Sequence, residues 1–265
     1  MIAWCALVAL ALVLAAAPAA RAESGIARIW KRAAALALEP VPPFAVLQAR
    51  CGEDALCAGR VIARALGPRA RIVRLRPPDT DAIRLVKVKP SVTAVRRLGN
   101  GGLYVELRRF GIQALPELKA ALARRAFSRL VIDLRRNTGG DVARMLRLAA
   151  VFIGPRAKAV RLRTATGERW LDVPKPAWRV KARQITVLVG PKTASSAELL
   201  AALLRRYAGA RLLGARTFGK NWLVGAVPLA QGRALLVPSA IISVPGERIE
   251  GGLSPDAPLP PEFAQ

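Results

Sequence analysis

The sequence predicts an α/β fold, in which helices pack on a mixed, largely parallel sheet, preceded by a small helical N-terminal region. From Gly102 onward, short apolar segments typical of buried strands alternate with longer segments typical of helices. Hydrophobic residues make up 53% of the 265 residues, which is enough for a full core and excludes a disordered chain.

The first residues indicate export. Ile2 to Ala20 form an apolar stretch, and Ala20-Arg21-Ala22 before Glu23 resembles a signal-peptide cleavage site. We therefore expect residues 1–22 to be a signal peptide and the mature protein to be periplasmic or secreted. An uncleaved membrane anchor is the alternative, because the stretch is near the length that spans a bilayer.

Residues 23–101 are expected to form the small N-terminal region. Helical segments flank the proline-rich run Glu39–Pro43, and the alternating residues Arg84–Lys89 predict a strand. Cys51 and Cys57 lie in this region, and such a pair can form a disulfide in an oxidising compartment. Two buried thiols on one helix are the alternative.

Residues 102–256 are expected to form the main domain, and residues 257–265 a proline-rich tail. The predicted order is strand 103–110, helix 114–125, strand 130–134, helix 142–152, strands 159–163 and 170–173, strand 185–189, helix 195–207, and strands 211–213, 222–228 and 234–244.

The absence of histidine restricts the chemistry. With no histidine in the chain, a Ser–His–Asp triad, a Cys–His dyad and a histidine-ligated metal site are impossible. Acid–base chemistry must therefore come from Lys, Asp, Glu, Tyr or Cys. We expect no metal and no cofactor.

The chain is strongly basic, with 43 Lys and Arg against 17 Asp and Glu and a net charge of +26. The basic residues are scattered rather than clustered, and aromatic residues that could stack on bases make up only 5% of the chain. We therefore expect no nucleic-acid partner. The same charge allows association with an anionic membrane or envelope surface.

The first candidate motif is Asp133–Gly140, which closes a strand and opens a helix. Its paired glycines, Gly139 and Gly140, let the backbone approach a ligand closely and point N–H groups at it. An ordinary glycine turn is the alternative.

The second motif, Gly190–Glu198, joins a strand to a helix. A serine at a helix N-terminus lies among unpaired N–H donors, which suit a developing oxyanion. Ser195 with Glu198 three residues later also fits a capping box, in which the serine has only a structural role.

The third motif is Thr217–Lys220. Lysine is rare among the basic residues of this chain, and Lys220 is flanked by Phe218 and Trp222. A solvated surface lysine is the alternative.

Together the three motifs resemble the C-terminal processing peptidases, also called tail-specific proteases, over residues 102–256. The family pattern reads DLRxNxGG, then TASASE, then TFGK, and the spacing from serine to lysine also matches. The resemblance implies a crotonase/ClpP-like core and a serine endopeptidase acting on protein or peptide substrates. It further implies that Ser195 is the nucleophile and Lys220 the general base.

The resemblance also implies an oxyanion hole formed by the N–H of Gly139, or else Gly140, together with that of Ser196. Glu198 either orients the dyad or only caps the helix. The closing residues Gly251–Asp256 resemble the last strand and turn of the family.

Catalysis by lysine requires an uncharged amine. The ordinary lysine pKa is about 10.4, and useful activity needs it to fall to about 7. Burial beside Phe218 and Trp222 would favour the neutral form, so we expect Lys220 to be shielded from water.

Two features depart from the family pattern. Many members carry glutamine four residues after the lysine, where this chain has Val224. No recognisable PDZ domain, the module that binds substrate C-termini in many members, fits between residue 22 and Gly102. An inactive peptide- or ligand-binding protein on the same fold is therefore the alternative function. The sequence leaves the oligomeric state open.

Overall fold

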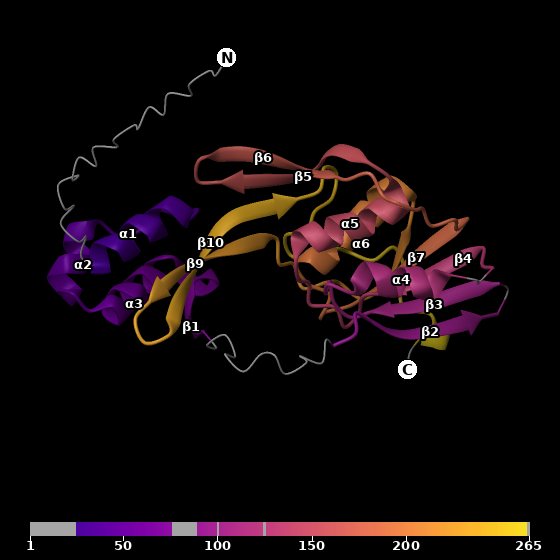
Figure 1. Ribbon diagram of the computed structural model, residues 1–265, viewed down its shortest axis with the longest axis horizontal. Helices are drawn as coiled ribbons and strands as arrows, with labels where there is room; N and C mark the ends of the chain where they lie inside the picture. The colour runs from indigo at the N-terminus through magenta and orange to yellow at the C-terminus, as the bar shows by residue number, and fades with distance from the viewer. Residues whose placement is uncertain (1–24, 76–88, 100, 124–125, 264–265) are drawn as a thin grey trace, which may run out of the picture.

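The computed structural model describes residues 25–75, 89–99, 101–123 and 126–263, and it forms a mixed α/β structure (Figure 1). The predicted signal peptide and nearly all of the strand predicted at residues 84–89 lie outside these ranges. Two five-stranded sheets organise the described residues, and we call them the core sheet and the arm sheet.

The core sheet has the strand order β2-β3-β4-β7-β8. Its strands are β2 (Val92–Leu98), β3 (Gly102–Leu107), β4 (Arg129–Asp133), β7 (Gln184–Val189) and β8 (Arg211–Gly214). Strands β3, β4, β7 and β8 are parallel, and β2 pairs antiparallel with β3 at one edge. Because the carboxyl ends of parallel strands meet at one edge, the segments that follow β4, β7 and β8 come together there.

Three helices cover one face of the core sheet, as Figure 1 shows. They are α4 (Ala114–Leu122), α5 (Val142–Ile153) and α6 (Ser196–Ala208). All residues of α6 from Ser196 to Leu204 are buried, so this helix lies at the centre of the largest hydrophobic cluster. The apolar run of this helix, with alanine and leucine on every side, explains its central position.

The opposite face of the core sheet carries a smaller cluster. Tyr104, Val131 and Leu188 from three neighbouring strands are buried there against Phe263, in the short helical turn Pro261–Phe263. The predicted tail therefore packs on the sheet, and Ala257 also bridges to Leu213 of β8.

The arm sheet is antiparallel throughout, which differs from the single largely parallel sheet that the alternation of elements predicted. Its strands are β1 (Arg71–Arg74), β5 (Arg156–Thr164), β6 (Gly167–Val173), β9 (Trp222–Leu229) and β10 (Arg233–Ser243). The predicted strand pattern could not distinguish these pairings, because an antiparallel hairpin and a parallel crossover both begin with the same local strand signal.

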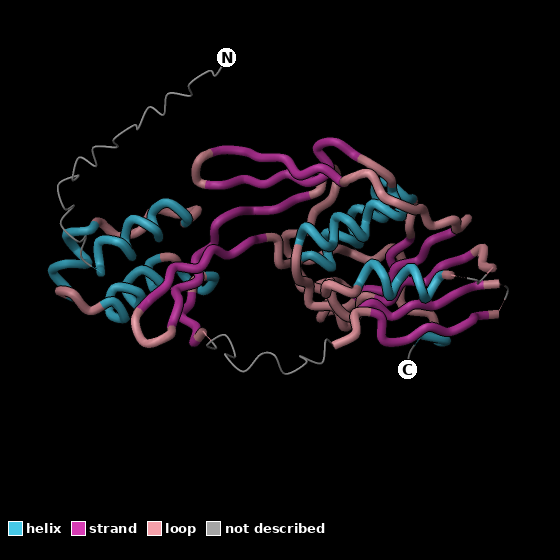
Figure 2. The backbone as a smooth tube through the Cα atoms, viewed as in Figure 1, coloured by secondary structure: helices cyan, strands magenta, loops and turns pink. Residues whose placement is uncertain are grey.

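The N-terminal part consists of α1 (Gly25–Leu36), α2 (Phe44–Cys51) and α3 (Ala55–Ala65). These helices bury their apolar faces against Val227, Leu235 and Val237 of the β9–β10 pair. Figure 2 shows this long strand pair joining the helical part to the core. Strand β1 follows the helices and pairs with β10, whereas β2, placed in the N-terminal region by the sequence analysis, pairs with β3.

A disulfide joins Cys51, the last residue of α2, to Cys57 in α3, with their Cα atoms 5.5 Å apart.

We expect the unreduced mature protein to weigh about 2 Da less than the fully reduced one, because one bridge removes two hydrogens. Replacing both cysteines by alanine should lower the free energy of unfolding by about 2 kcal/mol, since the closed loop is short. Intact-mass spectrometry and urea unfolding measure the two effects. A full complement of free thiols in protein purified without reductant would contradict the first.

Candidate active site

The three sequence motifs meet at the carboxyl edge of the core sheet. The segment after β4 is tied to the segment after β7, because the Ala194 N–H donates to the Asn137 carbonyl at 3.1 Å. The segment after β7 is tied to the segment after β8, because the Phe218 N–H donates to the Thr193 carbonyl at 3.0 Å. The strand order of the sheet thus brings together residues far apart in the sequence, such as Asn137 and Phe218, which are 81 positions apart.

Ser195 lies at the turn that begins α6, in a strained conformation. Its backbone has φ +58° and ψ −124°, a region that residues other than glycine rarely adopt. Such strain costs about 1–3 kcal/mol and is found most often at functional sites. A helix cap alone needs no such geometry, since an N-cap residue normally has an extended backbone.

Glu198 is fully buried, with 0% of its surface exposed, and its carboxylate links the serine and lysine segments. Its Oε2 accepts the backbone N–H of Ser195 and that of Lys220, each at 2.8 Å. Its Oε1 accepts the Thr217 hydroxyl at 2.5 Å and the Gly219 N–H at 2.6 Å. The Glu198 carboxylate therefore bonds both the residue at the start of the helix turn and the segment that carries Lys220.

The glycine pair lies against the serine turn. A Cβ added to Gly139 would lie 2.9 Å from the Ser195 Cβ and 3.0 Å from the Ser196 nitrogen, so only glycine fits at this φ of +96°. The Ser196 hydroxyl donates to the Gly140 carbonyl at 2.7 Å. Ser196 is the first residue of α6, and its N–H therefore has no acceptor within the helix.

The N–H of Gly139 is already bonded in this structure, because it donates to the Asn137 Oδ1 at 2.9 Å. Asn137 is fully buried, and its Nδ2 donates to the Leu107 carbonyl at 2.9 Å. A substrate oxygen could reach the Gly139 N–H only if Asn137 released it.

Asn137 and Thr193 were not among the residues predicted for the site. The Thr193 hydroxyl donates to the Leu134 carbonyl at 2.9 Å. The asparagine of the family pattern DLRxNxGG, which is Asn137 here, is the sequence signal that could have indicated this residue.

The predicted shielding of Lys220 is only partly present. Phe218 is 61% exposed, so it does not enclose the lysine as expected, and Lys220 and Trp222 are half-buried. The Trp222 ring instead contacts the guanidinium of Arg69, 4.9 Å from its centroid. The Phe218 side chain is exposed, whereas the N–H groups of the two residues that follow it bond the buried Glu198.

The closing loop Gly251–Leu253 packs against the lysine segment. The Leu253 N–H donates to the Thr217 hydroxyl at 2.7 Å, and the Thr217 N–H donates to the Leu253 carbonyl at 3.2 Å. A Cβ on Gly252 would lie 2.2 Å from the Thr217 carbonyl oxygen, so this approach requires glycine. Val224, at the position of the family glutamine, is 38% exposed on β9.

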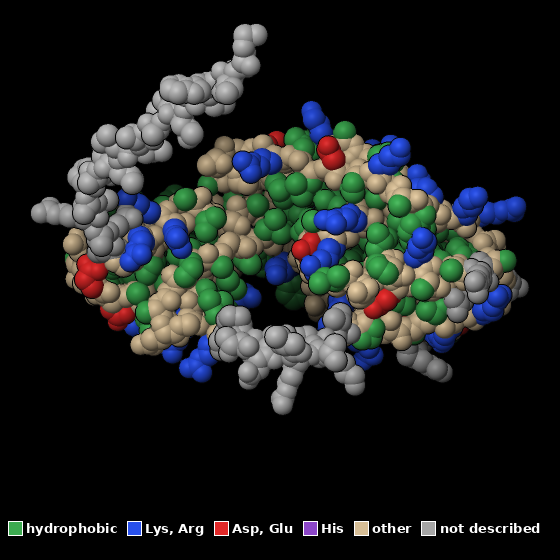
Figure 3. All heavy atoms as spheres, viewed as in Figure 1, with side chains coloured by type: hydrophobic (Ala, Val, Ile, Leu, Met, Phe, Trp, Pro, Cys, Tyr) green, Lys and Arg blue, Asp and Glu red, His purple; other side chains and the backbone are tan. Residues whose placement is uncertain are grey.

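The surface beside these loops is open. Strand β9 begins two residues after Lys220, so the candidate site lies where the strand pair β9–β10 leaves the core. Figure 3 shows a face that is hollowed between the helical part and the core, with Lys and Arg side chains spread over both.

In the described ranges, no group of three His, Cys, Asp or Glu side chains could hold a metal ion, and no helix is long and apolar enough to cross a bilayer.

Comparison with known proteins identifies related sequences. The chain is 28% identical over 216 residues to the carboxyl-terminal-processing protease of a Picosynechococcus species, covering 76% of this chain and 51% of that protein. It is 26% identical over 145 residues to a Staphylococcus epidermidis protein named "Probable CtpA-like serine protease", covering 51% of this chain and 29% of that protein. The chain thus spans about half or less of the length of these relatives.

Solved structures with the same fold include two of different length. The photosystem II D1 C-terminal processing protease is 25% identical with a TM-score of 0.51, and the match covers 73% of this chain and 49% of that one. A lipoprotein from Streptococcus agalactiae is 18% identical with a TM-score of 0.67, and the match covers 87% of this chain and 89% of that one.

The model of peptidase family S41 matches residues 102–259, which are more than half of the chain and contain all three motifs. The chain belongs to peptidase family S41.

Proposed function

We propose that this protein is an exported serine endopeptidase that hydrolyses peptide bonds of cell-envelope proteins, with Ser195 as nucleophile and Lys220 as general base. The observation that carries the proposal is the buried carboxylate of Glu198. One of its oxygens accepts the backbone N–H of both residues at 2.8 Å, so the two nitrogens lie no more than twice that distance apart. A helix cap would not need the second of these bonds.

In the proposed reaction, the Ser195 Oγ attacks the carbonyl carbon of the scissile bond and its proton passes to the neutral Lys220 Nζ. The resulting ammonium then protonates the departing amine, which leaves an acyl-enzyme on Ser195. Water attacks the acyl carbon and gives its proton to Lys220; the C–Oγ bond then breaks, the Lys220 ammonium returns the proton to the Ser195 Oγ, and the carboxylic acid product is released.

The oxyanion of each tetrahedral intermediate needs N–H donors. We assign the N–H of Ser196 and one N–H of the glycine pair to this role, since Gly139 lies directly against Ser195 and Ser196. Because the Gly139 N–H donates to Asn137, either Gly140 supplies the second donor or Asn137 releases the Gly139 N–H when substrate binds. Glu198 acts as a positioning residue, because it bonds only backbone and hydroxyl groups of the site segments.

We expect protein or peptide substrates to lie in the hollow between the helical part and the core (Figure 3), because β9, which begins two residues after Lys220, belongs to the strand pair that joins these two parts. Export rests on the apolar residues 2–20, and the net charge of +26 supports contact with an anionic envelope or membrane surface. Nucleic acid is not proposed as a partner.

A second candidate is an inactive peptide-binding protein on the same fold. It is favoured by one observation: among the described residues, no hydrogen bond joins the Lys220 Nζ to the Ser195 Oγ. The peptidase proposal expects this bond to form when substrate binds, because catalytic hydrogen bonds are often long in substrate-free enzymes.

Trapping the acyl-enzyme separates the two candidates. The mature protein is mixed with a peptide p-nitrophenyl ester, quenched in acid and digested for mass spectrometry. We expect an acyl adduct on the peptide that contains Ser195 in the wild type, and none in Ser195→Ala. Ester turnover no faster than that of Ser195→Ala, with no adduct at Ser195, would contradict the peptidase proposal and favour the binding protein.

A further inference from the structure

The tail of the chain contacts the first motif, at Arg135, from the far face of the core sheet. Phe263 is 6% exposed and its ring stacks on Tyr104, with centroids 6.1 Å apart and planes at 14°. Val131 and Leu188 complete this apolar seat. The seat fixes the backbone of the tail over the sheet, including the Phe263 carbonyl.

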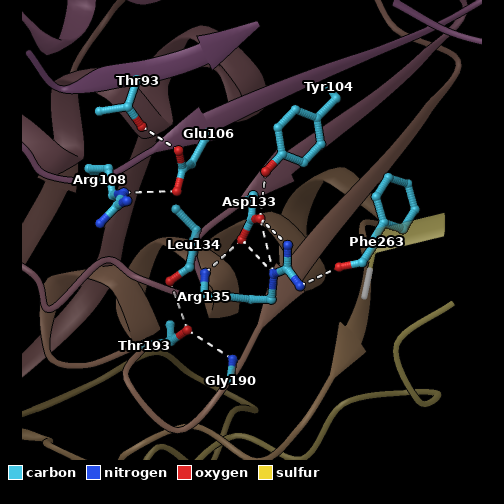
Figure 4. Close-up of polar contacts among 10 residues, drawn as sticks. All are labelled: Thr93, Tyr104, Glu106, Arg108, Asp133, Leu134, Arg135, Gly190, Thr193 and Phe263. Carbon is cyan, nitrogen blue, oxygen red and sulfur yellow. Dashed lines mark hydrogen bonds and ion pairs between the residues drawn. The ribbon is translucent and has the colours of Figure 1, made fainter. Parts of the chain in front are cut away.

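Arg135, in the first motif, bonds the tail to β4 (Figure 4). One of its terminal nitrogens donates to the Phe263 carbonyl at 2.5 Å, and the other donates to the Asp133 Oδ2 at 2.7 Å. Its Nε and backbone N–H also donate to the Asp133 carboxylate, whose side chain is only 4% exposed. The side chain of Arg135 thus has a single orientation, set by Asp133 on one side and the tail on the other.

Tyr104 completes this arrangement. Its hydroxyl donates at 2.7 Å to the Asp133 Oδ2, the same oxygen that Arg135 bonds. Burial and the bond to Asp133 raise the pKa of Tyr104 to about 12, so the hydroxyl stays a donor at physiological pH. We call Tyr104, Asp133, Arg135 and Phe263 the tail clamp.

The tail clamp is continuous with the predicted oxyanion loop. Leu134, between the two charged residues of the clamp, accepts the Thr193 hydroxyl at 2.9 Å and the Asn137 N–H at 2.9 Å through its carbonyl. The same Thr193 hydroxyl accepts the Gly190 N–H at 3.0 Å (Figure 4). Asn137 in turn accepts the Gly139 N–H through its Oδ1 and the Ala194 N–H through its carbonyl, and Ala194 directly precedes Ser195.

We propose that Phe263 and Arg135 are positioning residues: the seated tail holds Arg135 against Asp133 and so fixes the loop of residues 134–140 relative to Ser195. This inference rests on the proposed function, because it assigns the loop a role in binding the oxyanion. The tail is therefore part of the working enzyme, although it lies on the sheet face opposite α6.

Hydrogen exchange of the amides of residues 134–140 tests the clamp without reference to activity. In Phe263→Ala we expect their exchange rate to rise about tenfold, because the loop opens locally once the seat is lost. Phe263→Leu keeps an apolar group in the seat and should restore much of the protection. The stability control is Leu47→Ala, a fully buried residue of the N-terminal helices, and the neighbour control is the exposed Glu262→Ala. Neither should change exchange at residues 134–140.

Kinetics provide the second measurement. Phe263→Ala should lower kcat for the peptide ester about tenfold with KM within twofold, because the loop is displaced while the hollow proposed to bind substrate is unchanged. Leu47→Ala should keep the wild-type kcat. Exchange and kcat in Phe263→Ala that match those in Leu47→Ala would overturn the proposal.

A separate variant keeps the test decisive if Phe263→Ala does not fold. Tyr104→Phe removes only the hydroxyl bond to Asp133 and should raise exchange at residues 134–140 by a smaller factor. Unchanged exchange in that variant would contradict the clamp. A wild-type protein with no hydrolytic activity would instead contradict the proposed function, while the exchange measurement would still decide whether the clamp holds the loop.

Discussion

Replacing Ser195 by alanine should lower kcat/KM for a peptide substrate by about 10⁴-fold or more, because the proposed nucleophile is removed. Replacing Lys220 by alanine should have an effect of similar size, because no other side chain with a base of suitable strength replaces it in a chain without histidine. Since the two residues act as a unit, the double variant should be no slower than either single one.

The measurement is hydrolysis of casein or a fluorogenic peptide, with the folded state of each variant checked by circular dichroism. Lys192→Ala provides a matched control, because Lys192 is an exposed lysine in the same segment as Ser195. It should keep wild-type activity. Equal background rates in the wild type, Ser195→Ala and Lys220→Ala would show that the dyad is not catalytic.

Replacing Glu198 by alanine should lower kcat/KM about 10²- to 10³-fold and also destabilise the fold by about 3 kcal/mol or more. Four donors lose their acceptor: the N–H groups of Ser195, Gly219 and Lys220 and the hydroxyl of Thr217. Glu198→Gln should be nearly as harmful, because each carboxylate oxygen accepts two bonds and an amide NH₂ in either position would face two donors.

Glu117→Ala is the matched control for this variant. Its carboxylate also accepts two backbone N–H groups, those of Ser91 and Val92 at 2.7 and 2.8 Å, but neither of these residues belongs to the three motifs. Glu117→Ala should lower the free energy of unfolding, as measured by urea unfolding. Its kcat/KM, corrected for the active fraction by active-site titration, should equal that of the wild type. If Glu198→Ala loses stability but keeps the wild-type kcat, Glu198 acts only as a helix cap.

The local elements were predictable because their signals are local. The helices predicted at residues 142–152 and 195–207 are α5 and α6, each within a residue or two of its observed ends. Asp141 caps α5 by accepting the Arg144 N–H at 2.8 Å, and Gly209 ends α6 at φ +63°. Such capping and periodicity depend on neighbours in the chain and need no knowledge of the fold.

The exposure of Phe218 shows where sequence reasoning failed. A flanking aromatic residue was taken as a shield for Lys220, but the backbone of this segment is turned by Glu198, which is more than 20 residues earlier in the chain. The direction of a side chain in an irregular loop depends on such distant partners, so no local pattern could predict it.

The sequence by itself determined the alternation of strands and helices, the residues able to carry acid–base chemistry, and the exclusion of any histidine-dependent mechanism. Only the tertiary structure decided that the chain forms two sheets, that Asn137 holds the Gly139 N–H, and that Phe263 reaches Arg135 from the opposite face. The physical reason is that strand order and buried hydrogen bonds join residues far apart in the chain, and composition and periodicity carry no record of which distant groups will meet.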